Sequence, residues 1–436
     1  MSDIDQLFPV SVGRAANSGL TLAGLDLAEL AHAWGTPLYL YDAATVRQEA
    51  GSLQDLLNAH YPGDREITYA AKAYFSLGFA RKLAKMGLGV DVVSLGELFT
   101  AKKAGFQPER IHLHGNNKSE DELVSAMQYG VHAIVVDSLE ELAFLEGIAG
   151  RLQNPARIWL RITPGVNVST HPSIQTGHAG SKFGLLVQDG QAAEGIQRAK
   201  ASRWLKLSGL HMHLGSQIFE AEPYREAVSR LCDLAEEMDY IPQEISPGGG
   251  WGVPYTPADQ NQPLDTWVRA ASGTVKTEFE RRSWPLPKLI LEPGRCIAAR
   301  AGVAIYSVGT SKKGTNGESI VALDGGMADN PRPALYQSRY SAVKVDQPDA
   351  EPVWETSLVG KFCESGDYMI HNIGLPELKR DDLVAIPVSG AYQISMASNY
   401  NLAQRPAVLW LDGGSVEVLQ AREKPEAMPY WDEAGV

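Results

Sequence analysis

The sequence has few cysteines, no long apolar run and no excess of positive charge. Its three cysteines, Cys232, Cys296 and Cys363, are too few for a disulfide framework, so we expect a reducing compartment. The N-terminus lacks the basic region and apolar run of a signal peptide. No apolar stretch approaches the ~20 residues that a membrane helix needs. These absences predict a cytoplasmic protein that does not enter the membrane.

Acidic residues outnumber basic ones by 52 to 39, which gives a formal net charge of −13. A chain this acidic has no general attraction for phosphate backbones, so the composition argues against nucleic acid as a partner. Any anionic ligand would need a local basic pocket. The length of 436 residues and the 44% of hydrophobic residues are typical of an enzyme with a sizeable core and two or three domains.

Between residues 66 and 295, short β-rich runs alternate with longer amphipathic stretches. The β-rich runs cover 66–71, 89–94, 111–115, 133–138, 157–164, 207–214, 244–248 and 288–292, with seven helical candidates between them. Eight such units over about 230 residues match the size of a (β/α)8 barrel. A doubly wound open sheet is the alternative, but its glycine-rich turn should follow the first strand. Here the glycine cluster follows the seventh run.

After Arg295 the pattern changes to short β-rich runs separated by turn residues. This change predicts a second, mostly antiparallel β domain. Another β-rich run, TPLYLYD at 36–42, precedes the barrel and could join that domain. We therefore expect an α/β protein. Its TIM-like (β/α)8 barrel would span 44–297, and its β domain would be built from 1–43 and 298–436.

The C-terminal ends of the strands form the active-site face of such a barrel. In this chain these ends carry polar residues or glycines: Lys72, Asp91, Ser94, His114, Asn116, Asp137, Arg161, His211, His213, Ser216, Gly248 to Gly250, Glu292 and Arg295. Their convergence on one rim predicts a catalytic or binding site there.

Three features of this rim indicate a cofactor. Lys72 stands among small apolar residues, which would favour the neutral amine that forms Schiff bases, although an ordinary solvated lysine is the simpler interpretation. The glycines 248–250 would let backbone N–H groups face a phosphate, or would only form a tight turn. Glu292 could hold a proton on a ring nitrogen, or could only pair with Arg295. Together the three features describe a pyridoxal phosphate site.

Two His-x-His pairs keep a metal-dependent hydrolase open as an alternative. Residues two apart on a strand share one face, so each pair could supply two metal ligands. The residues available for such a site are His112, His114, His211, His213, Asp91, Asp137 and Glu292. A metal site would leave Lys72 and the glycines without a role, so we expect no metal.

Ten short motifs follow one another along the chain. They are YAAKA (69–73), GVDVVSLGEL (89–98), HGNNKS (114–119), TGHAGSKFG (176–184), HMHLGSQI (211–218), GGGWG (248–252), EPGR (292–295), DGGMADNPRPALY (324–336), CESGD (363–367) and GAYQISMASNYN (390–401). In this order they resemble the fold-type III pyridoxal phosphate decarboxylases. CESGD and RPALY narrow the resemblance to the diaminopimelate decarboxylase family, over nearly the whole chain.

The resemblance implies roles in cofactor binding. Lys72 would carry pyridoxal 5'-phosphate covalently, His213 would stack on its ring, and Glu292 would bind the ring nitrogen. The other cofactor-binding residues would be Asp91, Ser216, Gly248, Gly249, Gly250, Gly294, Arg295 and Tyr392.

The resemblance also implies how a substrate is bound. The substrate-binding residues would be Arg295, Arg332 and Tyr336 at the distal carboxylate, Glu364 at the distal ammonium group, and Tyr392. Cys363 would protonate the carbanion that remains when carbon dioxide leaves. In a homodimer, Cys363 and Glu364 would come from the partner subunit, so that the active sites would be shared.

The implied activity is decarboxylation of meso-2,6-diaminopimelate to L-lysine, the last step of lysine biosynthesis. A guanidinium can bind a carboxylate bidentately, and lysine or ornithine lacks a distal carboxylate, so Arg332 with Glu364 favours diaminopimelate. Tyr74 and Lys361 depart from the family's usual residues. The open alternatives are a decarboxylase of another amino acid (a carboxylated polyamine precursor, a carrier-bound amino acid, lysine or ornithine), a non-catalytic regulatory homologue and the metal-dependent hydrolase.

Overall fold

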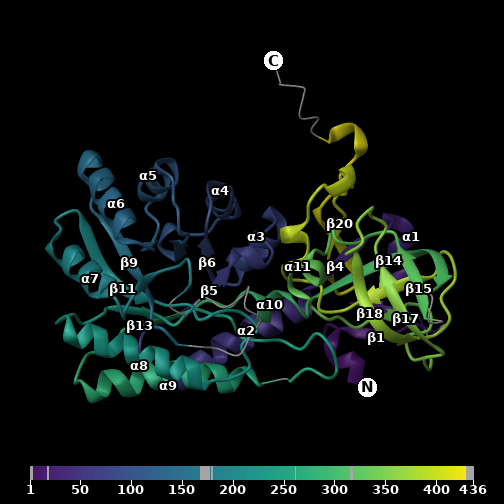
Figure 1. Cartoon of the computed structure of the whole chain (residues 1–436), viewed down its shortest axis with the longest axis horizontal. Coiled ribbons are helices and arrows are strands. Elements are labelled where there is room, and N and C mark those ends of the chain that lie inside the picture. Colours follow the sequence, from purple (N-terminus) through teal and green to yellow (C-terminus); the bar gives the residue numbers. More distant parts are fainter. Residues whose placement is uncertain are drawn as a thin grey trace. The chain divides into compact units, whose positions relative to one another are not determined.

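The computed structural model describes residues 3–16, 19–166, 177, 180–260, 262–314 and 318–428. The chain divides into two compact units, shown in Figure 1. The first, here called the barrel unit, comprises residues 49–253 and 261–296. The second, here called the β unit, comprises residues 1–48, 254–260 and 297–436. The β unit is thus assembled from three separate stretches of sequence.

Eight parallel strands close into a ring in the barrel unit. They are β5 (Arg65–Ala70), β6 (Gly89–Val92), β7 (Ile111–Leu113), β8 (Ala133–Val136), β9 (Ala156–Thr163), β11 (Leu205–His211), β12 (Glu244–Ser246) and β13 (Lys288–Leu291). Each pairs in parallel with its neighbour, and the β8–β9 and β13–β5 pairs complete the ring. A short strand, β10 (Leu185–Leu186), adds to β9. The predicted barrel is confirmed, and the open-sheet alternative is wrong.

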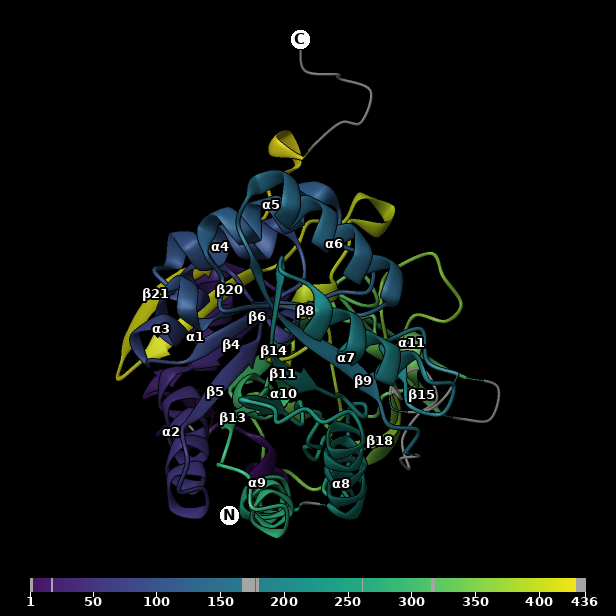
Figure 2. The ribbon, with the colours of Figure 1, turned by 90° about the vertical axis from the view of Figure 1, so that its left-hand side faces the viewer.

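Helices surround the strands, as the end-on view in Figure 2 shows. They are α2 (Ala43–His60), α3 (Leu77–Lys85), α4 (Leu95–Ala104), α5 (Glu120–Tyr129), α6 (Leu139–Leu152), α7 (Gln191–Ala201), α8 (Glu222–Glu237) and α9 (Leu264–Arg281). Seven of them lie between barrel strands, as predicted. Ser94, Ser119 and Ser138 begin α4, α5 and α6 by accepting a backbone N–H in the first turn. Within the described part of the chain, no helix is long and apolar enough to cross a membrane.

The β unit is built on a sheet with the order β18-β17-β15-β14-β4-β20-β21, to which β19 and β16 attach. Its strands are β4 (Leu38–Asp42), β14 (Gly302–Lys313), β15 (Ser319–Leu323), β16 (Val343–Lys344), β17 (Trp354–Val359), β18 (Tyr368–Leu375), β19 (Leu383–Ile386), β20 (Ala407–Asp412) and β21 (Ser415–Gln420). Most pairs are antiparallel, as predicted, whereas β4–β20 and β15–β17 are parallel. The early strand β4 pairs with both β14 and β20, which confirms that the 36–42 run joins this sheet.

Smaller elements complete the β unit. A three-stranded sheet is formed by β1 (Val12–Arg14), β2 (Leu20–Leu22) and β3 (Leu25–Asp26), and α1 (Leu27–Trp34) follows it. Alternate residues of β4 and β14, such as Leu38 and Ile305, pack with these elements in one apolar core. The short helix α11 (Arg332–Tyr336) belongs to this unit, whereas α10 (Arg295–Ala298) begins in the barrel unit and ends in the β unit. Both helices begin at arginines of the predicted site.

One buried carboxylate ties together three strands of the barrel. Glu244, at the start of β12, is 3% exposed. It accepts hydrogen bonds from His132 Nε2 at 2.6 Å, Trp159 Nε1 at 2.7 Å and Ser208 Oγ at 2.9 Å, and Arg157 Nη2 lies 3.0 Å away. Burial acts to raise the pKa of Glu244, but these donors and the nearby charges hold the pKa well below its usual range. The group is therefore anionic in the folded protein.

We expect Glu244→Gln to lower the free energy of unfolding by about 3 kcal/mol at pH 7, because it leaves buried donors without their anion. Since its folded pKa is depressed, Glu244 contributes stability above its unfolded pKa of about 4.3, and that stability is lost as pH falls. The stability of Glu244→Gln should depend less on pH below this value. Urea unfolding from pH 3 to 7 measures both effects. The control is Glu237→Gln, at an exposed residue of α8. Equal losses of unfolding free energy in the two variants would contradict the stabilising role of the Glu244 anion.

Candidate active site

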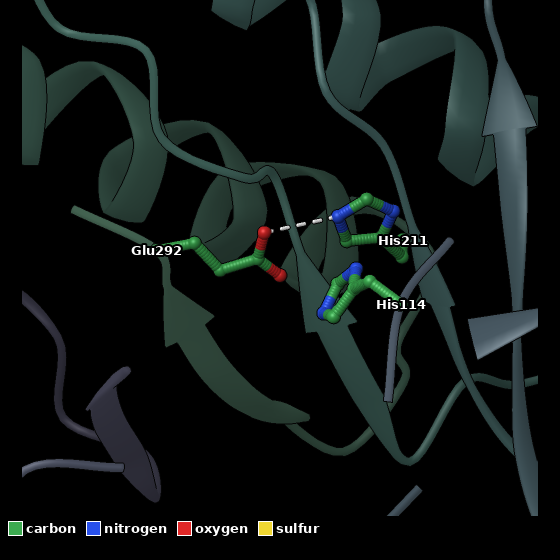
Figure 3. A group of neighbouring side chains, drawn as sticks. All are labelled: His114, His211 and Glu292. Carbon is green, nitrogen blue, oxygen red and sulfur yellow. Dashed lines mark hydrogen bonds and ion pairs between the residues drawn. The ribbon is translucent and has the colours of Figure 1, made fainter. Parts of the chain in front are cut away.

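Three barrel strands bring polar side chains to one buried carboxylate. Glu292 follows β13 and is 8% exposed. His211 Nε2, at the end of β11, donates to Glu292 Oε2 at 3.1 Å, and Ser246 Oγ, at the end of β12, donates to Oε1 at 2.5 Å. His114, after β7, lies beside them with its ring centroid 5.0 Å from that of His211 (Figure 3). The C-terminal ends of the strands therefore carry the site, as predicted for a barrel.

Glu292 shares this interior with a second buried carboxylate, Asp91 on β6. Asp91 Oδ1 lies 3.4 Å from His114 Nε2. Burial raises the pKa of Asp91 well above its usual range, and the charge of Glu292 raises it further. Burial also acts to raise the pKa of Glu292, but the charge of His211 and the hydrogen bonds from His211 and Ser246 hold it well below its usual range. Glu292 is therefore anionic, and its charge disfavours the ionisation of Asp91.

Lys72 lies at the end of β5, in a single 3-10 turn formed by Ala71–Ala73. The turn buries both alanines and leaves Lys72 exposed. The structure therefore agrees with the simpler interpretation of an exposed lysine, because the turn buries the two alanines and not Lys72. Burial lowers the pKa of His213 well below its usual range, and the charge of Lys72 lowers it further. At this rim, burial and the charge of Lys72 thus keep His213 neutral.

The glycine loop after β12 has close backbone packing. A Cβ atom at Gly249 would come 1.9 Å from the carbonyl oxygen of Glu292, and one at Gly250 would come 2.0 Å from that of Gly215. Packing alone therefore requires glycine at both positions. A Cβ at Gly248 would also meet His213 Nδ1 at 2.9 Å. The N–H groups of Gly249 and Gly250 have no acceptor within the described residues, so they are available to an anion.

The EPGR motif gives Glu292 and Arg295 separate partners. Arg295 begins α10 and is buried, and its Nη2 donates to Ser216 Oγ at 2.8 Å. Gly294 lies tightly against β5, because a Cβ there would be 3.0 Å from that of Ala70. The motif thus places a carboxylate inside the barrel and a guanidinium beside Ser216.

In the β unit, Arg332 begins α11 and is 4% exposed. Its Nη1 donates to Tyr340 Oη at 2.5 Å, and its guanidinium carbon lies 4.5 Å from the ring centroid of Tyr255. The rings of Tyr255 and Tyr340 are themselves packed edge to face at 5.2 Å. Two tyrosines therefore fix the plane of the guanidinium. Tyr336 ends the same helix and is half-buried.

The other predicted residues of the β unit lie in turns. Cys363 and Glu364 are exposed between β17 and β18, and the Cys363 N–H donates to Asn401 Oδ1 at 3.3 Å. The three cysteines form no disulfide, and Cys232 and Cys296 are buried. Tyr392 has a φ of +60°, a conformation that a residue with a Cβ adopts at a cost. Such strain is typical of functional segments.

Among the described residues, one cluster of side chains could ligate a metal ion. His114, His211 and Glu292 offer atoms within 4.8 Å of one another. Each His-x-His pair supplies one histidine to this cluster, His114 from the first and His211 from the second, while His112 stacks on Trp159 at 4.4 Å. Both oxygens of Glu292 accept hydrogen bonds from protein donors. Those donors already orient the carboxylate without a metal.

The barrel residues fit pyridoxal phosphate. The exposed amine of Lys72 can be reached by an aldehyde, and the anionic carboxylate of Glu292 can accept a hydrogen bond from a protonated ring nitrogen. The N–H groups of Gly249 and Gly250 can bind a phosphate. The amine, the carboxylate and the glycine-loop N–H groups would each contact a different part of the cofactor.

Sequence reasoning missed three residues of the site. Ser246 ends a barrel strand, so the rule that selected the other strand ends could have found it. Tyr255 carries no comparable signal, because it lies far from Arg332 in the sequence, and Tyr340, eight residues after Arg332, stands in no motif that points to the site. In the motif TGHAGSKFG, Thr176, His178 and Ala179 lie outside the described residues.

Known proteins resemble the chain over nearly its whole length. Residues 44–299 match the family described as pyridoxal-dependent decarboxylase, pyridoxal binding domain. Diaminopimelate decarboxylase of Bacillus methanolicus is 38% identical over 93% of this chain and 94% of its own length, and that of Bacillus subtilis (strain 168) is 39% identical over 93% of each. The crystal structure of diaminopimelate decarboxylase from M. jannaschii in co-complex with L-lysine has a TM-score of 0.89 and 31% identity, covering 95% of this chain and 96% of that one. The chain belongs to the pyridoxal-dependent decarboxylase family, within the group of the diaminopimelate decarboxylases.

Proposed function

We propose that this protein decarboxylates meso-2,6-diaminopimelate to L-lysine with pyridoxal 5'-phosphate bound at Lys72. The observation that carries the proposal is the anionic Glu292, held inside the barrel at the rim that also carries Lys72 and the glycine loop. The relatives named diaminopimelate decarboxylase and the solved lysine co-complex support the choice of substrate and product.

Bound pyridoxal phosphate supplies an electron sink for the carbon that loses carbon dioxide. Glu292 would accept a hydrogen bond from the protonated ring nitrogen and so strengthen the electron sink. A racemase would favour a weaker electron sink, so Glu292 favours a decarboxylase. His213, neutral because its pKa is lowered, packs against the ring. Burial and the charge of Glu292 raise the pKa of Asp91, which disfavours a second negative charge in this interior. These residues keep the proton on the ring nitrogen while the reaction proceeds.

The remaining barrel residues act on the phosphate. The N–H groups of Gly249 and Gly250 donate to its oxygens, with Gly248 and Gly294 keeping the backbone close. Ser216 and Arg295 are already hydrogen-bonded to one another, and they add a hydroxyl and a positive charge. Tyr392 of the β unit contributes its hydroxyl in the same role.

The substrate's far end is bound by residues that distinguish it from simpler amino acids. Arg332, with its plane fixed by two tyrosines, grips the distal carboxylate together with Tyr336 and Arg295. Glu364 binds the distal ammonium group. Cys363, exposed and with a free thiol, delivers a proton to the carbon from which carbon dioxide departs. We further propose a cytoplasmic homodimer in which Cys363 and Glu364 of one copy act in the barrel of the other.

The direct test is to incubate the pure protein with meso-2,6-diaminopimelate and pyridoxal phosphate and to measure carbon dioxide and L-lysine. We expect both products in equal amounts from the wild type. Lys72→Ala should lose the products and also the visible absorption of the bound cofactor. The matched control is Lys206→Ala, at an exposed lysine on β11, which should keep both. Turnover of another amino acid without any lysine formation would refute the substrate assignment.

The role of Arg332 is tested by comparing substrates. Arg332→Ala should lower kcat/KM for diaminopimelate about 100-fold, because a charged hydrogen-bonding partner of the distal carboxylate is lost. Any turnover of L-lysine or L-ornithine should change little, since they have no such carboxylate. Arg339→Ala, at an exposed arginine nearby in the sequence, is the control. Equal losses on all substrates would assign Arg332 a structural role.

The shared site is tested by mixing two inactive variants. Lys72→Ala and Cys363→Ala copies, exchanged into mixed dimers, should recover about a quarter of wild-type turnover, because half the dimers then hold one intact site. A chain that carries both substitutions should recover nothing with either variant. If each site belonged to one copy, mixing would restore no activity.

A further inference from the structure

Two turns of the β unit carry the residues proposed to act on the substrate. One turn, 360–367, joins β17 to β18 and contains Cys363 and Glu364. The other, 325–331, leads from β15 into α11 and Arg332. Almost 30 residues of sequence separate the two turns, and they include α11, β16 and β17. A contact between them would fix the proton donor relative to the carboxylate-binding arginine.

Asp367 makes that contact with one carboxylate. It closes the motif CESGD and is 4% exposed, although Cys363 and Glu364 in the same motif are exposed. Its Oδ1 accepts the N–H of Met327 at 2.7 Å, and its Oδ2 accepts the N–H of Phe362 at 3.0 Å. Each oxygen thus holds a different turn, since Met327 precedes Arg332 and Phe362 precedes Cys363.

The backbone around Asp367 is shaped to admit its carboxylate. A Cβ at Gly326 would come 2.6 Å from both carboxylate oxygens, and one at Gly360 would come 2.0 Å from Oδ2. Glycine at each position leaves the space that the carboxylate fills. The N–H of Lys361 also donates to the carbonyl of Gly325 at 3.1 Å, so the two turns share a backbone hydrogen bond next to the carboxylate.

The turn that carries Met327 is itself anchored to the sheet. Asp329 Oδ1 accepts the N–H of Gly326 at 2.9 Å. Asp329 Oδ2 accepts hydrogen bonds from the hydroxyls of Tyr39 on β4, at 3.1 Å, and Tyr306 on β14. The 325–331 turn is therefore the fixed partner, and Asp367 attaches the more exposed 360–367 turn to it.

We propose that Asp367 is a positioning residue that holds the Cys363–Glu364 turn against the Arg332 turn. This proposal rests on the function proposed above for Cys363, Glu364 and Arg332. Asp367 does not itself act on substrate, because both of its oxygens are occupied by backbone N–H groups and its side chain is buried. Because Cys363 and Glu364 are proposed to act in the partner's barrel, the Asp367 carboxylate ties the turn that serves the partner's substrate to the turn whose Arg332 serves this copy's own substrate.

The clamp is tested by hydrogen–deuterium exchange of the intact holoenzyme, read on peptides covering 325–331 and 358–368. Asp367→Ala should speed exchange about tenfold in both peptides, since each loses a hydrogen bond to a charged acceptor. Asp26→Ala is the matched control, because Asp26 also accepts two backbone N–H groups in the β unit, at the start of α1. It should leave both peptides unchanged.

If Asp367→Ala does not fold, Asp367→Asn keeps the shape and one acceptor oxygen, and should speed exchange in at least one of the two turns. Faster exchange only in 358–368 for Asp367→Ala would overturn the clamp, because Asp367 would then stabilise its own turn alone. Unchanged exchange in both peptides would overturn it as well.

Catalysis is the second readout. Asp367→Ala should lower kcat about tenfold or more while the visible absorption of the bound cofactor stays unchanged, because the cofactor site is intact and only the substrate groups are displaced. Unchanged kcat with faster exchange would overturn the positioning role. If the wild type decarboxylates no substrate, the function proposed above fails, and the exchange measurements still decide whether Asp367 joins the two turns.

Discussion

The hydrogen bonds from His211 and Ser246 to Glu292 keep a negative charge in an interior that would otherwise reject it. The closed barrel makes this possible, because consecutive strands β11, β12 and β13 end side by side and each supplies one of the three residues. Burial raises the pKa of Asp91, and the charge of Glu292 raises it further. The anionic carboxylate of Glu292, inside the barrel whose rim bears Lys72, is the basis of the proposed chemistry.

Close backbone packing holds the residue that bears this carboxylate. The glycine loop after β12 lies against the carbonyl of Glu292 so closely that no side chain fits between them. The loop thus serves the strand end as a packing surface, and the N–H groups of Gly249 and Gly250 are available to an anion. In the proposed function, this short segment links the residue that would bind the cofactor ring to the groups that would bind its phosphate. The β unit uses carboxylates differently, since Asp329 and Asp367 organise backbone turns.

Much of this arrangement could be predicted from residue patterns. The eight strands and the helices between them follow from hydrophobic periodicity. Three of these helices begin at a serine whose side chain accepts a backbone N–H of the first turn. Lys72, Asp91 and Glu292 could be selected because they stand at strand ends. For Lys72 the simpler interpretation, an exposed lysine, agrees with the structure, although the periodicity of a strand does not show which way a 3-10 turn after it faces. Ser246 could have been found by the same rule as Glu292.

The sequence by itself determined the barrel, the mostly antiparallel β domain and the set of polar residues at the rim. These depend on local periodicity and on the rule that parallel strands end on one face. Only the tertiary structure decided which of those residues bond to one another. The pairing of Glu292 with His211, the contact of Tyr255 with Arg332, and the bridge from Asp367 to Met327 each join residues distant in the chain. Such contacts arise from the closure of sheets and the packing of turns, and a single sequence carries no local signal for them.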